Sequence, residues 1–107
     1  MRTVMVRYKV KPESAAENER LIGKVFEQLA RDKPAGMRYQ VFKLGDGVSF
    51  VHVASSEAGK EGNPLTQLDA FKAFTAGIKE RCEEPPVTVE MQPIGAYDAM
   101  DAGSSPA

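Results

Sequence analysis

The sequence has no tryptophan, one cysteine and one histidine among its 107 residues. A lone thiol, Cys82, excludes an internal disulfide and a cysteine-rich zinc site. The 14 Lys and Arg residues nearly balance the 15 Asp and Glu residues, so the net charge is −1. Without a positive excess, the chain is not expected to bind nucleic acid. His52 has no carboxylate or cysteine at ligand spacing, so we expect no metal site. The function expected below also needs no bound cofactor.

No apolar run approaches the roughly 20 residues that a membrane helix needs. Residues 1–7 are too short and too charged for a signal peptide. We therefore expect a cytoplasmic protein without a membrane partner. The length allows one domain, residues 1–97. Residues 98–107 are mostly small and polar and predict a flexible C-terminal tail.

Alternating and helical apolar spacings predict the elements before and after a central hairpin. Residues 3–10 alternate and predict a strand. An apolar stripe from Leu21 to Leu29 predicts a first helix, which Ser14 and Glu17 are expected to start as a capping box. A second helix is predicted over residues 66–82, capped by Thr66 and Asp69. Pro85 and Pro86 should end it before a last strand over residues 87–92.

Two apolar runs, residues 37–44 and 48–54, flank Gly45-Asp46-Gly47 and predict a β-hairpin. The loop length decides which side chains share a face. A three-residue loop, with Gly47 in the left-handed region, separates apolar from polar positions cleanly. A two-residue loop would instead pair Gln40 with Val53 and Val41 with His52. The cleaner segregation favours the three-residue loop.

Strand, helix, hairpin, helix, strand is the βαββαβ order of ferredoxin-like α+β folds, with a four-stranded antiparallel sheet and two helices on one face. The residues expected beneath the helices are Val4, Val6, Tyr8, Val51, Val53, Val87 and Val89. The opposite face should carry Met5, Arg7, Arg38, Gln40, Phe42, Leu44, Phe50, His52, Glu90 and Gln92. This mixed face is too apolar for water and too polar for a dry core, so we expect a second copy to cover it around a partly wet cavity.

The chain resembles the dimeric α+β barrel superfamily, in its antibiotic-biosynthesis-monooxygenase-like branch. The resemblance spans roughly residues 1–97 and is carried by residues 4–10 (VMVRYKV), 47–53 (GVSFVHV), 63–68 (NPLTQL), 71–74 (FKAF) and 77–86 (GIKERCEEPP). It implies a homodimer whose sheets meet face to face, with a ligand cavity within the barrel or between sheet and helices. Members include cofactor-free oxygenases of polyketide quinones, haem-degrading enzymes, isomerases and proteins without a known reaction.

The resemblance also implies different site residues for the oxygenase type and the haem-degrading type of the family. The oxygenase type is implied to use Asn, Trp and Tyr around a phenolic substrate, and the absence of tryptophan here departs from that set. The haem-degrading type needs a histidine on the second helix and an asparagine on the first strand. Residues 66–82 contain no histidine and residues 3–10 contain no asparagine, so haem degradation is disfavoured.

His52 and Arg7 are the candidate catalytic residues. The imidazole of His52 has a free pKa near neutrality and suits a general base. Alternatively, it is an imidazole hydrogen-bonded in a wet interior. The guanidinium of Arg7 suits an oxyanion, and an ion pair with Glu90 is the alternative. The expected substrate-binding residues are Gln40, Phe42, Phe50, Glu90 and Asn63. Tyr8 and Tyr39 are expected in the core, and the alternative is that Tyr8, Tyr39 or Tyr97 donates a phenolic hydrogen bond to a substrate.

Together with these candidate residues, the resemblance implies a cofactor-independent monooxygenase-like protein acting on a small aromatic or quinone-type compound. The alternative is a non-catalytic dimer that binds a small molecule or only assembles. The cavity distinguishes the two hypotheses: an open pocket that reaches His52 favours the enzyme, and a packed interior favours the structural role.

Overall fold

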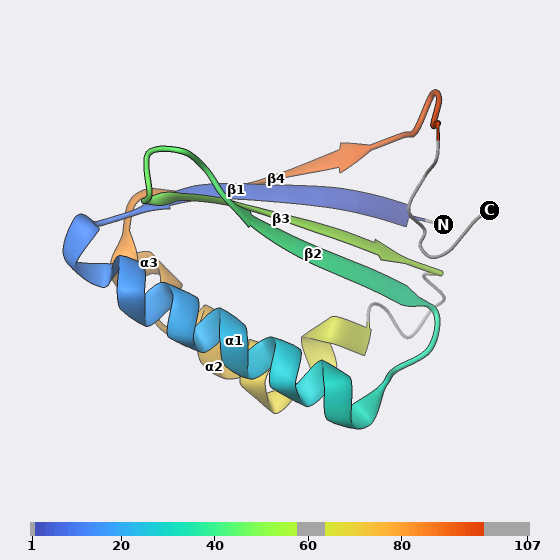
Figure 1. The fold of residues 1–107 in the computed structure, drawn as a ribbon, viewed down its shortest axis with the longest axis horizontal. Helices are drawn as coiled ribbons and strands as arrows, with labels where there is room; N and C mark the ends of the chain where they lie inside the picture. The colour runs from blue at the N-terminus through green and yellow to red at the C-terminus, as the bar shows by residue number, and fades with distance from the viewer. Residues whose placement is uncertain (1, 58–63, 98–107) are drawn as a thin grey trace.

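The computed structural model describes residues 2–57 and 64–97 (Figure 1). Its elements are β1 (Arg2–Val10), α1 (Ala15–Asp32), β2 (Met37–Lys43), β3 (Ser49–Ser56), α2 (Asp69–Ala76), α3 (Ile78–Arg81) and β4 (Cys82–Met91). Short 3-10 helices, Pro12–Ser14 and Pro64–Gln67, precede α1 and α2. The predicted tail, residues 98–107, and Asn63 lie outside the described residues.

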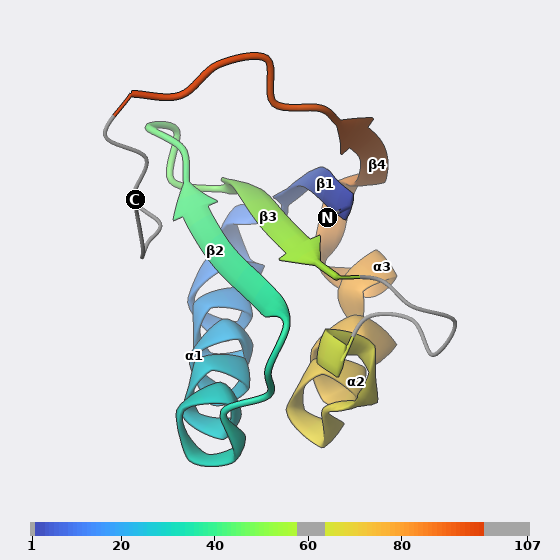
Figure 2. The ribbon, with the colours of Figure 1, turned by 90° about the vertical axis from the view of Figure 1, so that its right-hand side faces the viewer.

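The sheet has the strand order β2-β3-β1-β4, and every neighbouring pair is antiparallel. All the helices lie on one of its faces, with α1 beneath β2 and α2 beside α1 (Figures 1 and 2). The predicted ferredoxin-like α+β fold is therefore confirmed. No helix within residues 2–57 and 64–97 is long and apolar enough to cross a membrane.

The helix boundaries differ from the prediction at both helices. Ser14 makes no capping bond through its side chain. Glu17 instead accepts two hydrogen bonds from Arg20, at 2.8 and 2.7 Å. The second predicted helix is divided at Gly77 into α2 and α3. The last strand begins at Cys82, so Pro85 and Pro86 lie within it. A strand at the sheet edge tolerates proline because its outward N–H groups need no partner strand.

The predicted three-residue hairpin loop is wrong. Lys43 pairs with Phe50, and the amide of Leu44 donates to the carbonyl of Ser49 at 2.9 Å. The loop is therefore the four residues 45–48, and Gly47 adopts the expected positive φ of 78°. An even loop length gives the register that the sequence disfavoured, with Gln40 opposite Val53 and Val41 opposite His52.

The carboxylate of Asp46 explains this loop. It accepts hydrogen bonds from the amides of Val48 and Ser49, at 3.0 and 2.8 Å, and from the Ser49 hydroxyl at 2.6 Å. Such Asp side chains stabilise turns by replacing backbone partners. The hydroxyl and amide donors hold the pKa of Asp46 at about 2, below its ordinary value of 3.8.

The new register exchanges the residues of the two sheet faces, because residues that are directly opposite on neighbouring strands share a face. Phe50, His52 and Ala54 are buried beneath the helices. They join a core whose buried apolar members are Tyr8, Val10, Ile22, Val25, Phe50, Ala54, Leu65, Leu68 and Phe74. Val51 and Val53, predicted in the core, lie on the opposite face.

The last strand is also reversed relative to the prediction. Val87 pairs with Arg7 and Val89 pairs with Met5, so both valines lie on the face without helices, where they are 60% and 44% exposed. Glu90 alternates with Val89 and therefore lies on the other side of β4 from Arg7. The predicted grouping of Glu90 with Arg7 is wrong. Instead, the Arg2 guanidinium donates to Glu90 at 3.2 Å, at the exposed sheet edge.

We expect Asp46→Ala to loosen the hairpin loop, because the mutation removes the acceptor of three hydrogen bonds. Hydrogen exchange of the Val48 and Ser49 amides should become faster, whereas the Lys72 amide, inside α2, serves as the internal reference. The pKa of Asp46 is lower in the folded protein than in the unfolded one. Its contribution to the free energy of unfolding is therefore complete above about pH 4 and is lost as the pH falls through about 2. Unchanged exchange in Asp46→Ala would contradict this account of the loop.

Candidate functional site

His52 is the centre of a buried polar cluster. Its side chain lies on β3 and is only 5% exposed. The Nε2 atom lies 2.7 Å from the Tyr8 hydroxyl and the Nδ1 atom lies 2.6 Å from the Tyr39 hydroxyl. Tyr8 is opposite Phe50 and Tyr39 is opposite Ala54. Both tyrosines are thus diagonal neighbours of His52 on the same face, a distance that aromatic side chains can reach.

The cluster continues from Tyr8 into the helices. The Asn18 side chain, on α1, donates from Nδ2 to the Tyr8 hydroxyl at 2.9 Å. Arg81, at the end of α3, donates from Nε to the Oδ1 atom of Asn18 at 3.1 Å. Five residues from five elements therefore form one hydrogen-bonded chain, in the order Arg81, Asn18, Tyr8, His52 and Tyr39.

Arg81 is a buried cation, only 8% exposed. A second guanidinium nitrogen donates to the Phe74 carbonyl at 2.8 Å, and the guanidinium carbon lies 5.1 Å from the centre of the Phe74 ring. In the described part of the chain, no carboxylate forms an ion pair with it. An amide oxygen, a carbonyl and an aromatic face thus satisfy the charge.

Burial keeps the central groups neutral at ordinary pH. It lowers the pKa of His52 to about 4, because a charged imidazole is poorly solvated there. Burial also raises the pKa of Tyr8 and the pKa of Tyr39 well above the ordinary phenol value. The cluster is therefore two phenols and a neutral imidazole.

A cavity of about 240 Å³ adjoins this cluster between the sheet and α2. Its wall is mostly apolar, and the phenol and imidazole groups supply polar atoms. The lining residues are Val4, Val6, Tyr8, Tyr39, His52, Ala54, Leu65, Thr66, Phe71, Phe74, Thr75, Ile78 and Pro86. The volume and the aromatic lining suit a small planar ligand.

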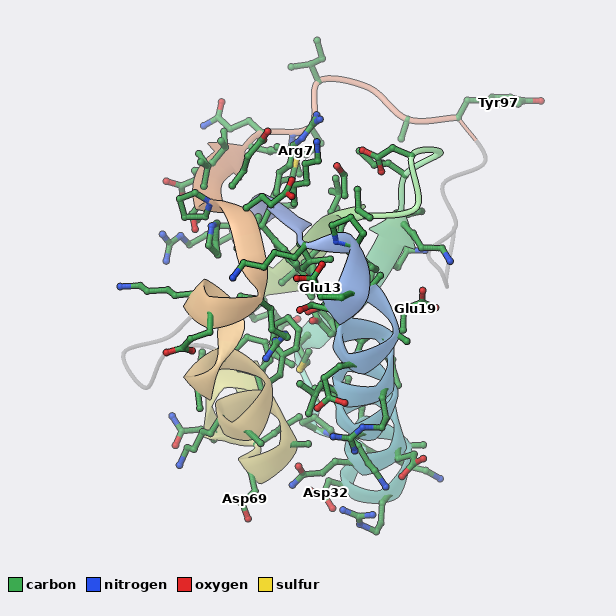
Figure 3. All side chains as sticks on the ribbon, turned by 90° about the vertical axis from the view of Figure 1, so that its left-hand side faces the viewer. Arg7, Glu13, Glu19, Asp32, Asp69 and Tyr97 are labelled. Atoms are coloured by element: carbon green, nitrogen blue, oxygen red, sulfur yellow. The ribbon has the colours of Figure 1, made fainter. Side chains whose placement is uncertain are left out.

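The structure separates the site residues that the sequence grouped together. His52 and Phe50 lie beneath the helices, where the Phe50 ring stacks on Tyr8 with centroids 5.6 Å apart. Arg7, Gln40 and Phe42 lie on the opposite sheet face. Figure 3 shows Arg7 on the side of the sheet away from the helices. None of these three residues, nor Phe50, lines the cavity at His52.

Four of the five hydrogen-bonded residues were not expected at the site from the sequence: Tyr8, Tyr39, Asn18 and Arg81. Tyr8 and Tyr39 were expected in the core, and they do lie on the helix-facing side. Asn18 and Arg81 carried a readable signal, since each polar side chain falls on an apolar helical stripe. Asn18 precedes Ile22 and Val25 at helical spacing, and both of these are buried. A polar residue at such a position needs a buried partner.

No group of three or more histidine, cysteine, aspartate or glutamate side chains within residues 2–57 and 64–97 could hold a metal ion. Partial burial raises the pKa of the Cys82 thiol.

Comparisons with known proteins identify the fold. No family model matches the chain, and no curated protein is detectably similar in sequence. Solved structures do match. An antibiotic biosynthesis monooxygenase is 18% identical with a TM-score of 0.72, and the match covers 89% of this chain and 100% of that one. A Nitrosomonas europaea protein proposed to be such a monooxygenase is 18% identical with a TM-score of 0.73, over the same shares.

A third match is SnoaB from Streptomyces nogalater, a cofactor-independent oxygenase, in its N63A mutant form. It is 15% identical with a TM-score of 0.66, and the match covers 92% of this chain and 97% of SnoaB. The fold is that of the antibiotic biosynthesis monooxygenases. The fold resemblance found in the sequence is confirmed. At these identities the likeness establishes the antibiotic biosynthesis monooxygenase fold and leaves activity and substrate to be argued from the site.

We expect the imidazole of His52 to titrate near pH 4, which one-dimensional NMR can follow because the chain has one histidine. The unfolded chain takes up this proton near pH 6.5. The free energy of unfolding should therefore decrease as the pH falls from about 6.5 to about 4, by on the order of 3 kcal/mol.

Urea unfolding of wild type and His52→Gln at several pH values isolates this contribution, because other groups titrate in both proteins. The difference between the two proteins should shrink as the pH falls. A titration midpoint near 6.5 would show instead that the imidazole is solvated.

Proposed function

We propose that the chain is a cofactor-independent monooxygenase that acts on a small aromatic or quinone-type compound. The observation that carries the proposal is the apolar cavity with the Tyr8, His52 and Tyr39 groups at its wall. Apolar walls bind a planar ring through burial of its surface, and a few fixed polar groups orient its oxygen. The likeness to oxygenase structures supports the same reading.

The reaction needs only oxygen and an electron-rich substrate. A ring methylene beside a phenol or ketone gives a proton to water and becomes an enolate, which can pass electrons to O₂. One oxygen atom becomes the new carbonyl, and the other leaves as water with the two methylene hydrogens. The substrate supplies all the electrons. The protein must hold the ring, exclude bulk water and stabilise the charge that develops on the enolate oxygen.

Tyr39 is the residue that we place against that oxygen. Its hydroxyl is held 2.6 Å from His52, and both residues line the cavity. Both ring nitrogens of His52 are already bonded to tyrosines, so the imidazole acts on the substrate through Tyr39 rather than directly. The oxyanion role first assigned to Arg7 does not suit its place on the opposite face of the sheet.

A second candidate function is binding without turnover. It is favoured by the complete hydrogen bonding of the His52 ring, which a purely structural cluster would also show. In this case the cavity holds a ligand of the same chemistry, and no group needs to accept a proton.

We expect oxygen uptake with a panel of hydroxylated bicyclic and tricyclic aromatics, measured with an oxygen electrode. Tyr39→Phe should reduce the rate about a hundredfold, because it removes one hydrogen bond to the developing oxyanion. Tyr97→Phe is the matched control, since it makes the same chemical change at a 97% exposed side chain far from the helices (Figure 3).

Ligand binding measured on the same proteins separates the two candidates. Binding to wild type with no oxygen uptake above that of His52→Ala would leave only the binding function. Equal rates in Tyr39→Phe and Tyr97→Phe would remove Tyr39 from the mechanism.

We also propose that a second copy of the chain covers the sheet face without helices. The apolar side chains on this face are Met5, Phe42, Val51, Val53, Val87, Val89 and Met91. Phe42, Val87 and Val89 are 47%, 60% and 44% exposed. Burying these three contributes on the order of 3 kcal/mol per protomer. The face loses Phe50 but is still more apolar than the sequence predicted, since His52 and Glu90 also leave it and four valines enter it.

Sedimentation velocity at micromolar concentration tests this pairing. We expect a dimer for wild type and a monomer for Val89→Lys, because an ammonium group would be buried in the contact. Thr88→Lys is the matched control on the other side of the same strand, and it should remain dimeric. A monomeric wild-type protein would contradict the proposed dimer.

A further inference from the structure

The buried hydrogen-bonded chain has one end that can only donate. The guanidinium of Arg81 has no acceptor atom. Its Nε therefore fixes the Asn18 side chain with Oδ1 towards Arg81. The amide group of Asn18 then faces Tyr8, so Nδ2 donates and the Tyr8 oxygen accepts.

The donation continues through Tyr8 to His52. The Tyr8 oxygen has accepted one hydrogen bond, and its own proton needs an acceptor in a buried setting. Within the described residues, the only acceptor in reach is the Nε2 atom of His52, at 2.7 Å. If Nε2 carried a proton instead, the Tyr8 hydroxyl proton would remain buried without a partner. Each tautomer leaves one hydroxyl proton without a protein acceptor, that of Tyr8 or that of Tyr39. Tyr8 is only 3% exposed, whereas the Tyr39 contact is only partly buried, so the arrangement with an unprotonated Nε2 is the less costly one.

A neutral imidazole with an unprotonated Nε2 carries its proton on Nδ1. That N–H donates to the Tyr39 oxygen at 2.6 Å. The proton of the Tyr39 hydroxyl then has no further acceptor among the residues that the structure describes. Because this hydroxyl lies against His52, a residue of the cavity wall, its proton is available to a molecule in the cavity.

We infer that Arg81 and Asn18 are positioning residues, which fix His52 as the Nδ1–H tautomer and make Tyr39 a hydrogen-bond donor to the ligand. The ligand class follows from this direction: a compact ring system that presents an acceptor oxygen, such as a ketone, a quinone carbonyl or an ionised phenol. A ligand that offers only an N–H or O–H donor is disfavoured. The inference rests on the proposed function for the location of the ligand, and the tautomer itself does not depend on it.

The permanent charge of Arg81 also favours this direction. The hydrogen bonds that run from Arg81 to Tyr39 are all polarised in the same direction, with the positive end at α3 and the donor end at the cavity. An oxyanion that forms on the ligand is therefore stabilised by the whole chain, although only Tyr39 contacts it.

The tautomer can be measured directly in the ligand-free protein. In untagged, ¹⁵N-labelled protein at neutral pH, long-range ¹H–¹⁵N correlation spectra show one imidazole, because the chain has one histidine. We expect a protonated Nδ1 and an unprotonated Nε2. The tautomer shows the direction of the hydrogen bonds, and the ligand preference of the variants is the readout that a merely structural cluster would not change.

Asn18→Asp should reverse the direction of hydrogen-bond donation from Tyr8 to Tyr39, although the side chain keeps almost the same shape. The new carboxylate accepts from Arg81 with one oxygen and from the Tyr8 hydroxyl with the other. The Tyr8 oxygen must then accept from Nε2–H, and Nδ1 must accept from Tyr39. The spectrum should change to the Nε2–H tautomer. Arg81→Lys keeps a donor-only group and should retain the wild-type tautomer, whereas Arg81→Met should give a mixture.

Ligand preference should follow the tautomer. The probes are 1-indanone, which only accepts, indole, which only donates through nitrogen, and indane, which does neither. By calorimetry, wild type should bind 1-indanone about tenfold more tightly than indole, because an unmatched buried polar group is costly. Asn18→Asp should prefer indole over 1-indanone.

An Nε2–H tautomer in wild type, or an unchanged tautomer in a folded Asn18→Asp protein, would overturn the inference. If Asn18→Asp does not fold, the wild-type spectrum and the pair Arg81→Lys and Arg81→Met still decide it. The expected tautomers together with an absence of oxygen uptake would support the positioning role and remove the oxygenase proposal, so the two failures are distinguishable.

Discussion

The register of the β2–β3 hairpin is the constraint on which the rest of the structure depends. Asp46 accepts three hydrogen bonds within the loop and sets an even loop length. A shift by one residue would turn every side chain of β3 to the other face. His52 and Phe50 would then leave the core, and Val51 and Val53 would enter it. The position of His52 in the polar cluster and of Val51 and Val53 on the open face follow from this loop, whereas Val87 and Val89 reach the open face through the pairing of β4 with β1.

The buried cluster carries a cost that the fold must offset. Tyr8 and His52 are buried and Tyr39 is partly buried, so their polar atoms need fixed partners. The chain from Arg81 to Tyr39 provides these partners from α3, α1 and three strands. Such a network makes the packing of these elements mutually dependent. It also holds neutral donors beside an apolar cavity, where electrostatic interactions are stronger than in water.

The two faces of the sheet serve separate purposes. The face beneath the helices contains the core, the cluster and the cavity. The opposite face carries Phe42, Val87 and Val89 at half exposure or near it, with Arg7 among them. This division places the proposed catalytic residues and the proposed dimer contact on opposite sides of one layer. Mutations that disturb the proposed dimer contact can therefore be distinguished from mutations that disturb the cavity.

The order of elements was readable from the sequence alone, because the apolar periods of residues 3–10 and 21–29 are local properties and Pro34, Gly36 and Gly47 end or turn the chain wherever they lie. The resemblance to a known fold could also be found from the sequence, because it is carried by short local segments. The site was not. Whether His52 points inward depends on the parity of a loop, which a few hydrogen bonds of Asp46 decide. The partners of His52 come from positions 8, 18, 39 and 81, and only the packing of strands and helices around a shared core brings such distant residues within hydrogen-bond distance.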